Sequence, residues 1–160
     1  MSQIVINNAT IQDAGLILAF IRELAKYEKA EDQVVATIED IQNRLFASNA
    51  TARALICTLD GKAIGFAVYF FNFSTWLGKN GLYLEDLYIS PDYRAAGAGK
   101  KLIRHLAQIA VNNHCGRFEW NVLDWNTPAI KFYESIGAKP LEEWITYRLE
   151  GKALADFAGG

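Results

Sequence analysis

The stretch Gly81-Leu82-Tyr83-Leu84-Glu85-Asp86-Leu87-Tyr88-Ile89 carries bulky residues at both odd and even positions, and Ser90-Pro91-Asp92 ends it. A strand with bulky residues on both faces is typically covered on both sides, so we predict a central strand here. The segment Arg94-Ala95-Ala96-Gly97-Ala98-Gly99-Lys100 follows. It leads into a predicted helix over about residues 97–113, whose apolar stripe comprises Leu102, Ile103, Leu106 and Ala110.

This strand, turn and glycine-containing helix start are typical of an anion site. The first N–H groups of a helix lack intrahelical partners, and the helix dipole adds partial positive charge there. Glycines allow a phosphate to approach the backbone closely, and Arg94 and Lys100 add charge. The spacing does not fit a Walker A loop, and Leu102 stands where a dinucleotide fingerprint needs Gly or Ala. Taken alone, the two glycines are equally compatible with a plain turn.

The rest of the chain predicts a mixed α/β sheet in one domain, residues 1–160, in the order β-α-α-β-β-β-α-β-α-β. Thr10 and Thr37 each precede an aspartate by three residues, which indicates helix starts. Asp60-Gly61 predicts a hairpin turn, and Asn126 with Pro128 predicts a short helix that ends at Gly137. The remaining expectations are a first strand at residues 3–8, a loop at 72–80, a strand at 118–123, a last strand at about 142–149 and a polar tail.

Composition narrows the function. The formal net charge is −2, which disfavours nucleic acid as a partner. No apolar run approaches the ~20 residues that span a bilayer, and the N-terminus does not resemble a signal peptide, so we expect a cytoplasmic protein with no membrane partner. Cys57 and Cys115 are expected to be free thiols, and His105 and His114 show no metal-binding spacing.

The pattern Arg-x-x-Gly-x-Gly, placed after a central strand, resembles the acyl-CoA loop of the GNAT superfamily of N-acetyltransferases. Over residues 5–149 the chain is also similar to the spermidine/spermine (diamine) N-acetyltransferase family. The segments that carry this similarity are Glu23-Leu24-Ala25-Lys26-Tyr27-Glu28, Trp76 with Gly78-Lys79, Leu82-Tyr83-Leu84-Glu85-Asp86, Asp92-Tyr93-Arg94, Trp125-Asn126 with Pro128, and Phe132-Tyr133. The resemblance implies a GNAT-type, mostly antiparallel central sheet with helices on both faces, acetyl-CoA as co-substrate, no metal, and a homodimer.

Acetyl transfer to an amine needs a base, because an alkylammonium with a pKa near ~10.4 has no lone pair. Glu85 is our candidate base, and the resemblance supports it. Strict alternation would place it on one face with Tyr83 and Leu87, where partial burial would raise its pKa. The residues alone favour an ion pair with a neighbouring Lys or Arg instead. Asp86 would lie on the other face, where it would orient the sheet or bind substrate.

The resemblance also assigns the acid and the cofactor contacts. Tyr133 is expected to protonate the departing thiolate, and a backbone N–H near Leu87 is expected to stabilise the oxyanion. The implied cofactor-binding residues are Leu87, Tyr88, Ile89, Arg94, Ala95, Ala96, Gly97, Ala98, Gly99, Lys100, Asn126, Ala129 and Tyr133. Core packing is the alternative for Tyr133, and a plain helix cap is a role that Asn126 can combine with cofactor contact.

The implied substrate site comprises Tyr27, Glu28, Glu85, Glu119, Trp120, Asn121 and Glu142. Glu143 is an alternative to Glu142. Carboxylates and aromatic faces suit a small cationic amine, so we expect a polyamine or diamine rather than a protein substrate. Residues 119–121 depart from the smaller, less polar stretch of animal polyamine enzymes. Thialysine or another lysine-like amine therefore stays open as the substrate, as does a non-catalytic acyl-CoA sensor.

Overall fold

The computed structural model describes residues 2–160, which form two compact units, one up to residue 121 and one from residue 122 to residue 160. Each unit is described by itself. The strands of the first unit are β1 (Ile4–Asn8), β2 (Ala52–Leu59), β3 (Lys62–Ser74), β4 (Lys79–Ile89) and β5 (Arg117–Trp120). Its helices are α1 (Ala14–Tyr27), α2 (Ile38–Leu45) and α3 (Ala98–Asn112), with short 3-10 segments at Ile11–Asp13, Glu31–Gln33 and Pro91–Ala96.

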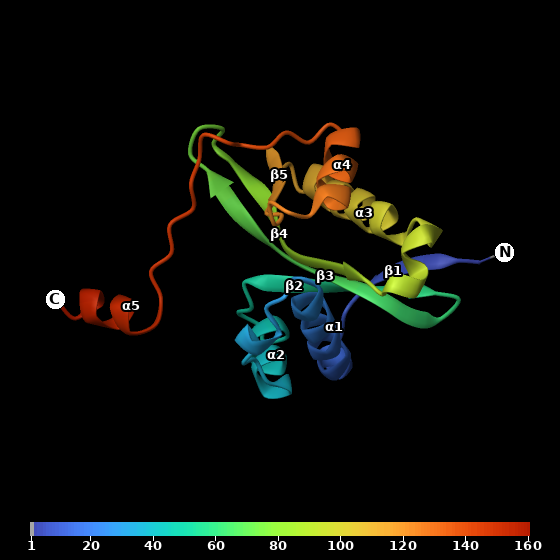
Figure 1. Ribbon diagram of the computed structural model, residues 1–160, viewed down its shortest axis with the longest axis horizontal. Helices are drawn as coiled ribbons and strands as arrows, with labels where there is room; N and C mark the ends of the chain where they lie inside the picture. The colour runs from blue at the N-terminus through green and yellow to red at the C-terminus, as the bar shows by residue number, and fades with distance from the viewer. Residues whose placement is uncertain (1) are drawn as a thin grey trace. The chain divides into compact units, whose positions relative to one another are not determined.

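The five strands form one sheet whose spatial order equals the chain order (Figure 1). The pairs β1–β2, β2–β3 and β3–β4 are antiparallel, and β4–β5 is parallel. A parallel pair needs a crossover connection, which α3 supplies. The predicted mixed, mostly antiparallel sheet is therefore confirmed.

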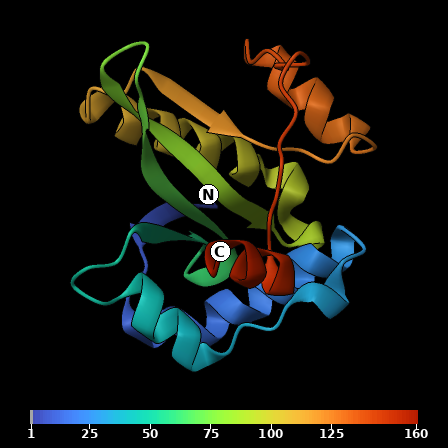
Figure 2. The ribbon, with the colours of Figure 1, turned by 90° about the vertical axis from the view of Figure 1, so that its left-hand side faces the viewer.

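Helices cover both faces of the sheet, as Figures 1 and 2 show, with α1 and α2 on one side and α3 on the other. On the first side, Phe20 of α1 stacks on Phe66 of β3 with 5.7 Å between ring centroids. Val68 and Tyr88 belong to the same buried cluster. On the other side, the stripe of α3 is buried as predicted. Two covered faces explain why β4 carries bulky residues at almost every position.

Local sequence signals account for most element ends. The Thr37 hydroxyl accepts from the Asp40 N–H at 3.1 Å, and the Asp40 carboxylate accepts from the Thr37 N–H at 2.8 Å. This is the predicted capping box. Thr10 with Asp13 makes a similar box, but it begins a 3-10 turn before α1 rather than α1 itself. The Asp60–Gly61 turn has φ values of 50° and 83°, the left-handed conformations that its hairpin requires.

Two predicted bounds in the first unit were wrong. The expected loop at residues 72–80 is shorter, because β3 continues to Ser74 and β4 begins at Lys79. The buried Ser74 closes the turn between them: its hydroxyl accepts from the Leu77 N–H at 3.2 Å, and its carbonyl accepts from the Gly78 N–H at 2.9 Å. The strand expected at 118–123 spans only Arg117–Trp120, because its pairing with β4 ends there.

The second unit holds α4 (Thr127–Ser135) and α5 (Gly151–Ala158). Asn126 caps α4 as predicted, since its side-chain oxygen accepts from the Ala129 N–H at 3.4 Å, and Gly137 has a φ of 92° just beyond the helix. The strand predicted at 142–149 was wrong: within residues 2–160 this stretch forms no strand ladder. The predicted polar tail beyond it forms α5.

Candidate active site

The turn before α3 has the geometry of an anion site. Gly97 adopts a φ of 78°, and α3 begins directly after it at Ala98. The first N–H groups of α3 therefore have no intrahelical acceptor. Open space surrounds the position where a Gly97 Cβ would lie. These features fit the pyrophosphate of a coenzyme, which such N–H groups and the helix dipole attract.

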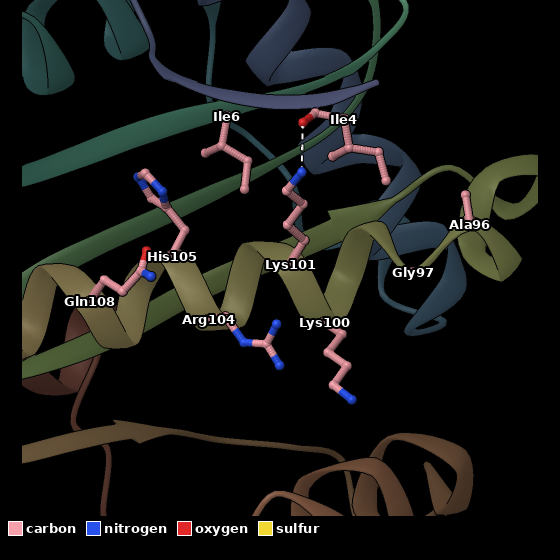
Figure 3. Close-up of a pocket in the computed structure, with 9 residues that line it drawn as sticks. All are labelled: Ile4, Ile6, Ala96, Gly97, Lys100, Lys101, Arg104, His105 and Gln108. Atoms are coloured by element: carbon pink, nitrogen blue, oxygen red, sulfur yellow. Dashed lines mark hydrogen bonds between the residues drawn. The ribbon is translucent and has the colours of Figure 1, made fainter. Parts of the chain in front are cut away.

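A groove of about 510 Å³ continues from this turn along α3 and β1 (Figure 3). Its lining residues are Ile4, Ile6, Ala96, Gly97, Lys100, Lys101, Arg104, His105 and Gln108. The Lys101 ammonium donates to the Ile4 carbonyl at 2.9 Å, whereas Lys100 and Arg104 point away from β1. Lys100 and Arg104 thus extend from the surface of α3 and add positive charge near the turn. The sequence predicted this role only for Lys100.

Arg94, the other predicted cation of the loop, has a different environment. Its Nε donates to the Ile89 carbonyl at 3.0 Å. Its guanidinium lies over two rings, 5.0 Å from the centroid of Tyr27 and 5.8 Å from that of Tyr88. The side chain therefore joins the turn to the last residue of α1 and to the end of β4.

A β-bulge at Glu85 determines how the side chains of β4 are arranged. Val68 of β3 pairs with Asp86, and the next residue, Tyr69, pairs with Leu84. Glu85 is thus the extra residue of β4. The bulge shifts the alternation, so Tyr83, opposite Phe70, and Leu87, opposite Ala67, lie on opposite faces of the sheet. The predicted common face of Tyr83, Glu85 and Leu87 was therefore wrong.

The bulge also separates the environments of two adjacent carboxylates. Glu85 is exposed, so the partial burial expected for it is not found. Asp86 lies opposite Val68, on the face that α1 and α2 cover. Burial, followed by the negative charges of Glu85 and Glu28, raises the pKa of Asp86 to about 6. A pKa in this range is typical of groups that exchange protons near neutral pH.

Further acidic groups surround these two residues. Glu28 follows the last turn of α1, and partial burial raises the pKa of its carboxyl. Burial, and then the charges of Glu85 and Glu119, raise the pKa of the Tyr83 phenol. Tyr83 is paired with Glu119 across β4 and β5. Glu28, Glu85, Asp86 and Glu119 thus make an acidic cluster in the first unit, where negative charge attracts a cation.

The sheet opens beside this cluster. The β4–β5 pairing runs from Gly81 opposite Arg117 to Leu84 opposite Trp120, and no β5 partner is paired with the later residues of β4 in the described chain. Leu87, Tyr88 and Ile89 pair only with β3. Trp120 ends β5 with its ring 4.9 Å from that of Phe118, and Asn121 follows as an exposed residue.

The remaining predicted site residues belong to the second unit. Asn126 and Ala129 form the cap of α4. Tyr133 lies in α4, where its ring packs against that of Phe132 at 5.8 Å. Glu142 and Glu143 are exposed residues of the segment between α4 and α5. Their predicted roles in catalysis and binding stay predictions.

Sequence patterns did not indicate two features of the site, the partly buried Asp86 and the stacked Arg94. Asp86 depends on a bulge that only the pairing with β3 reveals. Arg94 contacts Tyr27, which lies 67 positions earlier in the sequence. Among residues 2–160, no group of three or more His, Cys, Asp or Glu side chains is placed to hold a metal ion. No helix in this range is both long and apolar enough to cross a membrane.

Comparison with known proteins agrees with this geometry. The profile of the acetyltransferase (GNAT) family matches residues 18–138, which is well over half of the chain. The chain belongs to the acetyltransferase (GNAT) family. A thialysine N-epsilon-acetyltransferase of Sus scrofa is 38% identical over 170 aligned residues, which cover 99% of each chain. A spermidine/spermine N(1)-acetyltransferase-like protein 1 of Homo sapiens is 34% identical across 96% of this chain, which corresponds to 23% of that protein.

A solved integron cassette protein from V. cholerae has the same architecture, with a TM-score of 0.82, 28% identity and 98% coverage of both chains. The predicted GNAT-type fold and the predicted acetyltransferase activity are thus confirmed. GNAT acetyltransferases use acetyl-CoA, which agrees with the anion site at the start of α3. Within this family assignment, the acidic cluster is the candidate amine site, and the turn before α3 is the candidate coenzyme site.

Proposed function

We propose that this GNAT acetyltransferase moves the acetyl group of acetyl-CoA to a primary amine of a small cationic substrate. The acidic cluster carries the proposal, because Glu28, Glu85 and Asp86 lie next to one another where β4 leaves β5 and close to the turn before α3. Several carboxylates with no salt-bridge partner in the described chain create a strong attraction for a cation. Tyr27 adds an aromatic face that suits an ammonium group.

The substrate is proposed to be a lysine-like amine or a polyamine. A relative that matches over 99% of this chain is a thialysine acetyltransferase, which supports a lysine-like amine as the first candidate. The spermidine/spermine-like relative supports a polyamine or diamine as the second. Both substrate classes carry a protonated amine that the acidic cluster would attract. The groups at the other end of the substrate molecule therefore distinguish the two classes.

In the proposed reaction, the amine transfers a proton to Glu85, directly or through a water molecule, and its nitrogen then bonds to the acetyl carbon. The bond from that carbon to sulfur breaks, and Tyr133 protonates the thiolate. The nitrogen loses its second proton to the Tyr133 oxygen or to water, which leaves an acetamide and a free CoA thiol. The Leu87 N–H would stabilise the oxyanion. Residues 87–89 and 94–100, with Asn126 and Ala129, would hold the coenzyme. The family match from residue 18 to residue 138 crosses both units, which supports one acetyltransferase domain over residues 1–160.

A substrate panel tests the proposal. The protein is incubated with acetyl-CoA and, in separate reactions, thialysine, lysine, spermidine, spermine and putrescine, and free thiol is followed over time. We expect release with at least one amine, and the ratio of kcat/KM values identifies the substrate class. Coenzyme binding without release for any amine would instead support a non-catalytic acyl-CoA sensor.

The base assignment has its own test. Glu85→Gln keeps the size of the side chain and removes its charge, so we expect kcat/KM to fall by about 10²-fold or more, as for other positioned bases. Glu31→Gln, an exposed carboxylate of a 3-10 segment, is the control that should leave the rate unchanged. A Glu85→Gln enzyme with the full rate across the pH range would remove Glu85 from the mechanism.

The homodimer, the cytoplasmic location and the absence of nucleic-acid or membrane partners stay predictions. Sedimentation at micromolar concentration tests the dimer, which would have about twice the 17.9 kDa mass of the chain. A single species at the monomer mass would contradict it.

A further inference from the structure

The Arg94 side chain contacts both candidate binding regions. Arg94 lies in the Pro91–Ala96 segment that leads into the CoA turn, and its Nε donates to the Ile89 carbonyl at 3.0 Å. Its guanidinium lies over the ring of Tyr27, which ends α1 and precedes Glu28 of the acidic cluster. One planar side chain therefore connects the turn that would bind the coenzyme with the wall that would bind the amine.

The surroundings of Arg94 fix this arrangement. Tyr88, the second ring beneath the guanidinium, is 5% exposed and packs against Phe20 of α1 with 5.9 Å between centroids. Tyr27, by contrast, is 39% exposed. Arg94 forms no salt bridge within residues 2–160. The guanidinium thus rests on one buried ring and covers part of one exposed ring, so it limits where the Tyr27 ring can lie.

We propose that Arg94 is a positioning residue that holds Tyr27 and Glu28 against the CoA turn, so that coenzyme and amine binding are coupled through its side chain. The proposal rests on the proposed function for the identity of the two ligands. A ligand that orders the turn also orders Tyr27 through Arg94, and the reverse holds because such coupling is reciprocal. This role differs from the direct phosphate contact that the sequence predicted for Arg94.

Lysine substitution separates the two roles. Arg94→Lys keeps a positive charge that can reach a phosphate, but a lysine lacks the planar group that stacks on rings and donates to a carbonyl in a fixed direction. If Arg94 positions Tyr27, Arg94→Lys should raise the KM for the amine by about three- to tenfold, the range expected for losing such a contact. The KM for acetyl-CoA should change by less than the KM for the amine. The matched control, Lys100→Gln, should mainly weaken acetyl-CoA.

A calorimetric measurement tests the coupling without turnover. The Kd of CoA, which carries no acetyl group, is measured with and without saturating amine. We expect the amine to tighten CoA binding several-fold in the wild-type protein and to have no such effect in Arg94→Lys. Tyr27→Leu should show the same loss, and the double variant Arg94→Lys/Tyr27→Leu should be no worse than either single variant, because both remove one contact. Tyr27→Phe, which keeps the ring, should retain the coupling.

Wild-type turnover is measured in the same series, so failures can be told apart. Normal wild-type turnover with an unchanged amine KM and undiminished coupling in Arg94→Lys would overturn the role of Arg94 alone. A rise only in the KM for acetyl-CoA would contradict the positioning role and support direct phosphate binding by Arg94. Absence of wild-type turnover with every amine would overturn the proposed function, and the positioning role with it. Circular dichroism confirms that each variant is folded.

Discussion

Asp86 shows at the residue scale how a partly buried carboxylate can cost stability. Its pKa is raised from 3.8 to about 6 by burial and by the charges of Glu85 and Glu28. The folded protein therefore holds this proton more tightly than the unfolded chain does. The ionised carboxylate costs stability above about pH 6, and the cost disappears as the pH falls toward 4. Two pKa units correspond to about 3 kcal/mol.

The raised pKa of Asp86 leads to a prediction for Asp86→Asn, which removes the charge. We expect the free energy of unfolding to rise by about 2 kcal/mol at pH 8 and to change little near pH 4, as measured by urea denaturation. Amine acetylation should fall in the same variant. Asp32→Asn, which changes an exposed carboxylate, is the control at both pH values. Equal stability of Asp86→Asn and wild type at pH 8 would show that Asp86 is not strained by burial.

Asp86 also illustrates which part of the site the sequence alone could not predict. Glu85 was predicted to be the base, which stays a prediction, and an acidic cluster does form around it. Strict alternation failed, however, because the bulge depends on how β3 pairs with β4, and neither strand encodes that pairing locally. The contact between Arg94 and Tyr27 was missed for the same reason, since only the packing of α1 beside β4 brings them together.

At the scale of elements, two glycines in regular structure should respond in opposite directions to alanine. A Cβ on Gly65 of β3 would lie 2.3 Å from the Tyr88 carbonyl oxygen and 2.5 Å from the Ile89 Cδ1 atom. The backbone of β4 must move to admit it. A Cβ on Gly15 of α1 would meet nothing closer than the Ile38 Cδ1 atom at 3.7 Å, an ordinary contact.

We therefore expect Gly65→Ala to lower the free energy of unfolding by about 1–3 kcal/mol, as overpacking does. Gly15→Ala should raise it by about 0.5–1 kcal/mol through helix propensity. Thermal and urea denaturation measure both. Because the Ile89 carbonyl accepts the Arg94 hydrogen bond, Gly65→Ala should also weaken amine binding. A stable Gly65→Ala variant would mean that β3 and β4 can separate there without cost.

Elements with local signals were predicted well, and those that need a distant partner were not. Thr37, Asp60-Gly61 and Asn126 each act on backbone groups within a few residues, and each has the predicted role. The stretch 142–149 alternates Ile145, Tyr147 and Leu149 with polar residues, which favours a strand. A ladder also requires a neighbouring strand with free hydrogen-bonding groups, which alternation cannot supply.

For the whole molecule, this segment makes a prediction about assembly. Tyr147 is 91% exposed and Ile145 is 77% exposed. Exposed extended chain is a preferred site of proteolysis, so limited chymotrypsin treatment of a monomer should cleave first at Tyr147, as mass spectrometry of the fragments would show. If sedimentation finds a dimer and Tyr147 is protected until the dimer is diluted apart, the segment is covered by the second subunit. Cleavage at equal rates in both states would exclude that arrangement.

A second whole-molecule prediction concerns the coenzyme. A ligand that binds only the folded state stabilises it by about 2.7 kcal/mol at 100 times its Kd. Acetyl-CoA should therefore raise the melting temperature of the protein in proportion to the logarithm of its concentration. Lys100→Gln should need a higher concentration for the same shift, whereas Lys152→Gln, in α5, should not. Absence of any shift for the wild-type protein would contradict the coenzyme site.

The strand order of the sheet, β1-β2-β3-β4-β5, bears on how the protein reaches its fold. β2, β3 and β4 are joined by short turns, so their pairing closes only small loops. Pairing of β1 with β2 closes a longer loop that contains α1 and α2, and pairing of β5 with β4 closes one that contains α3. Longer loops close later and more slowly. We therefore expect the β2–β4 meander to form first. Pulse-labelled hydrogen exchange should find its amides protected first, before the turn at Gly97 can bind any anion.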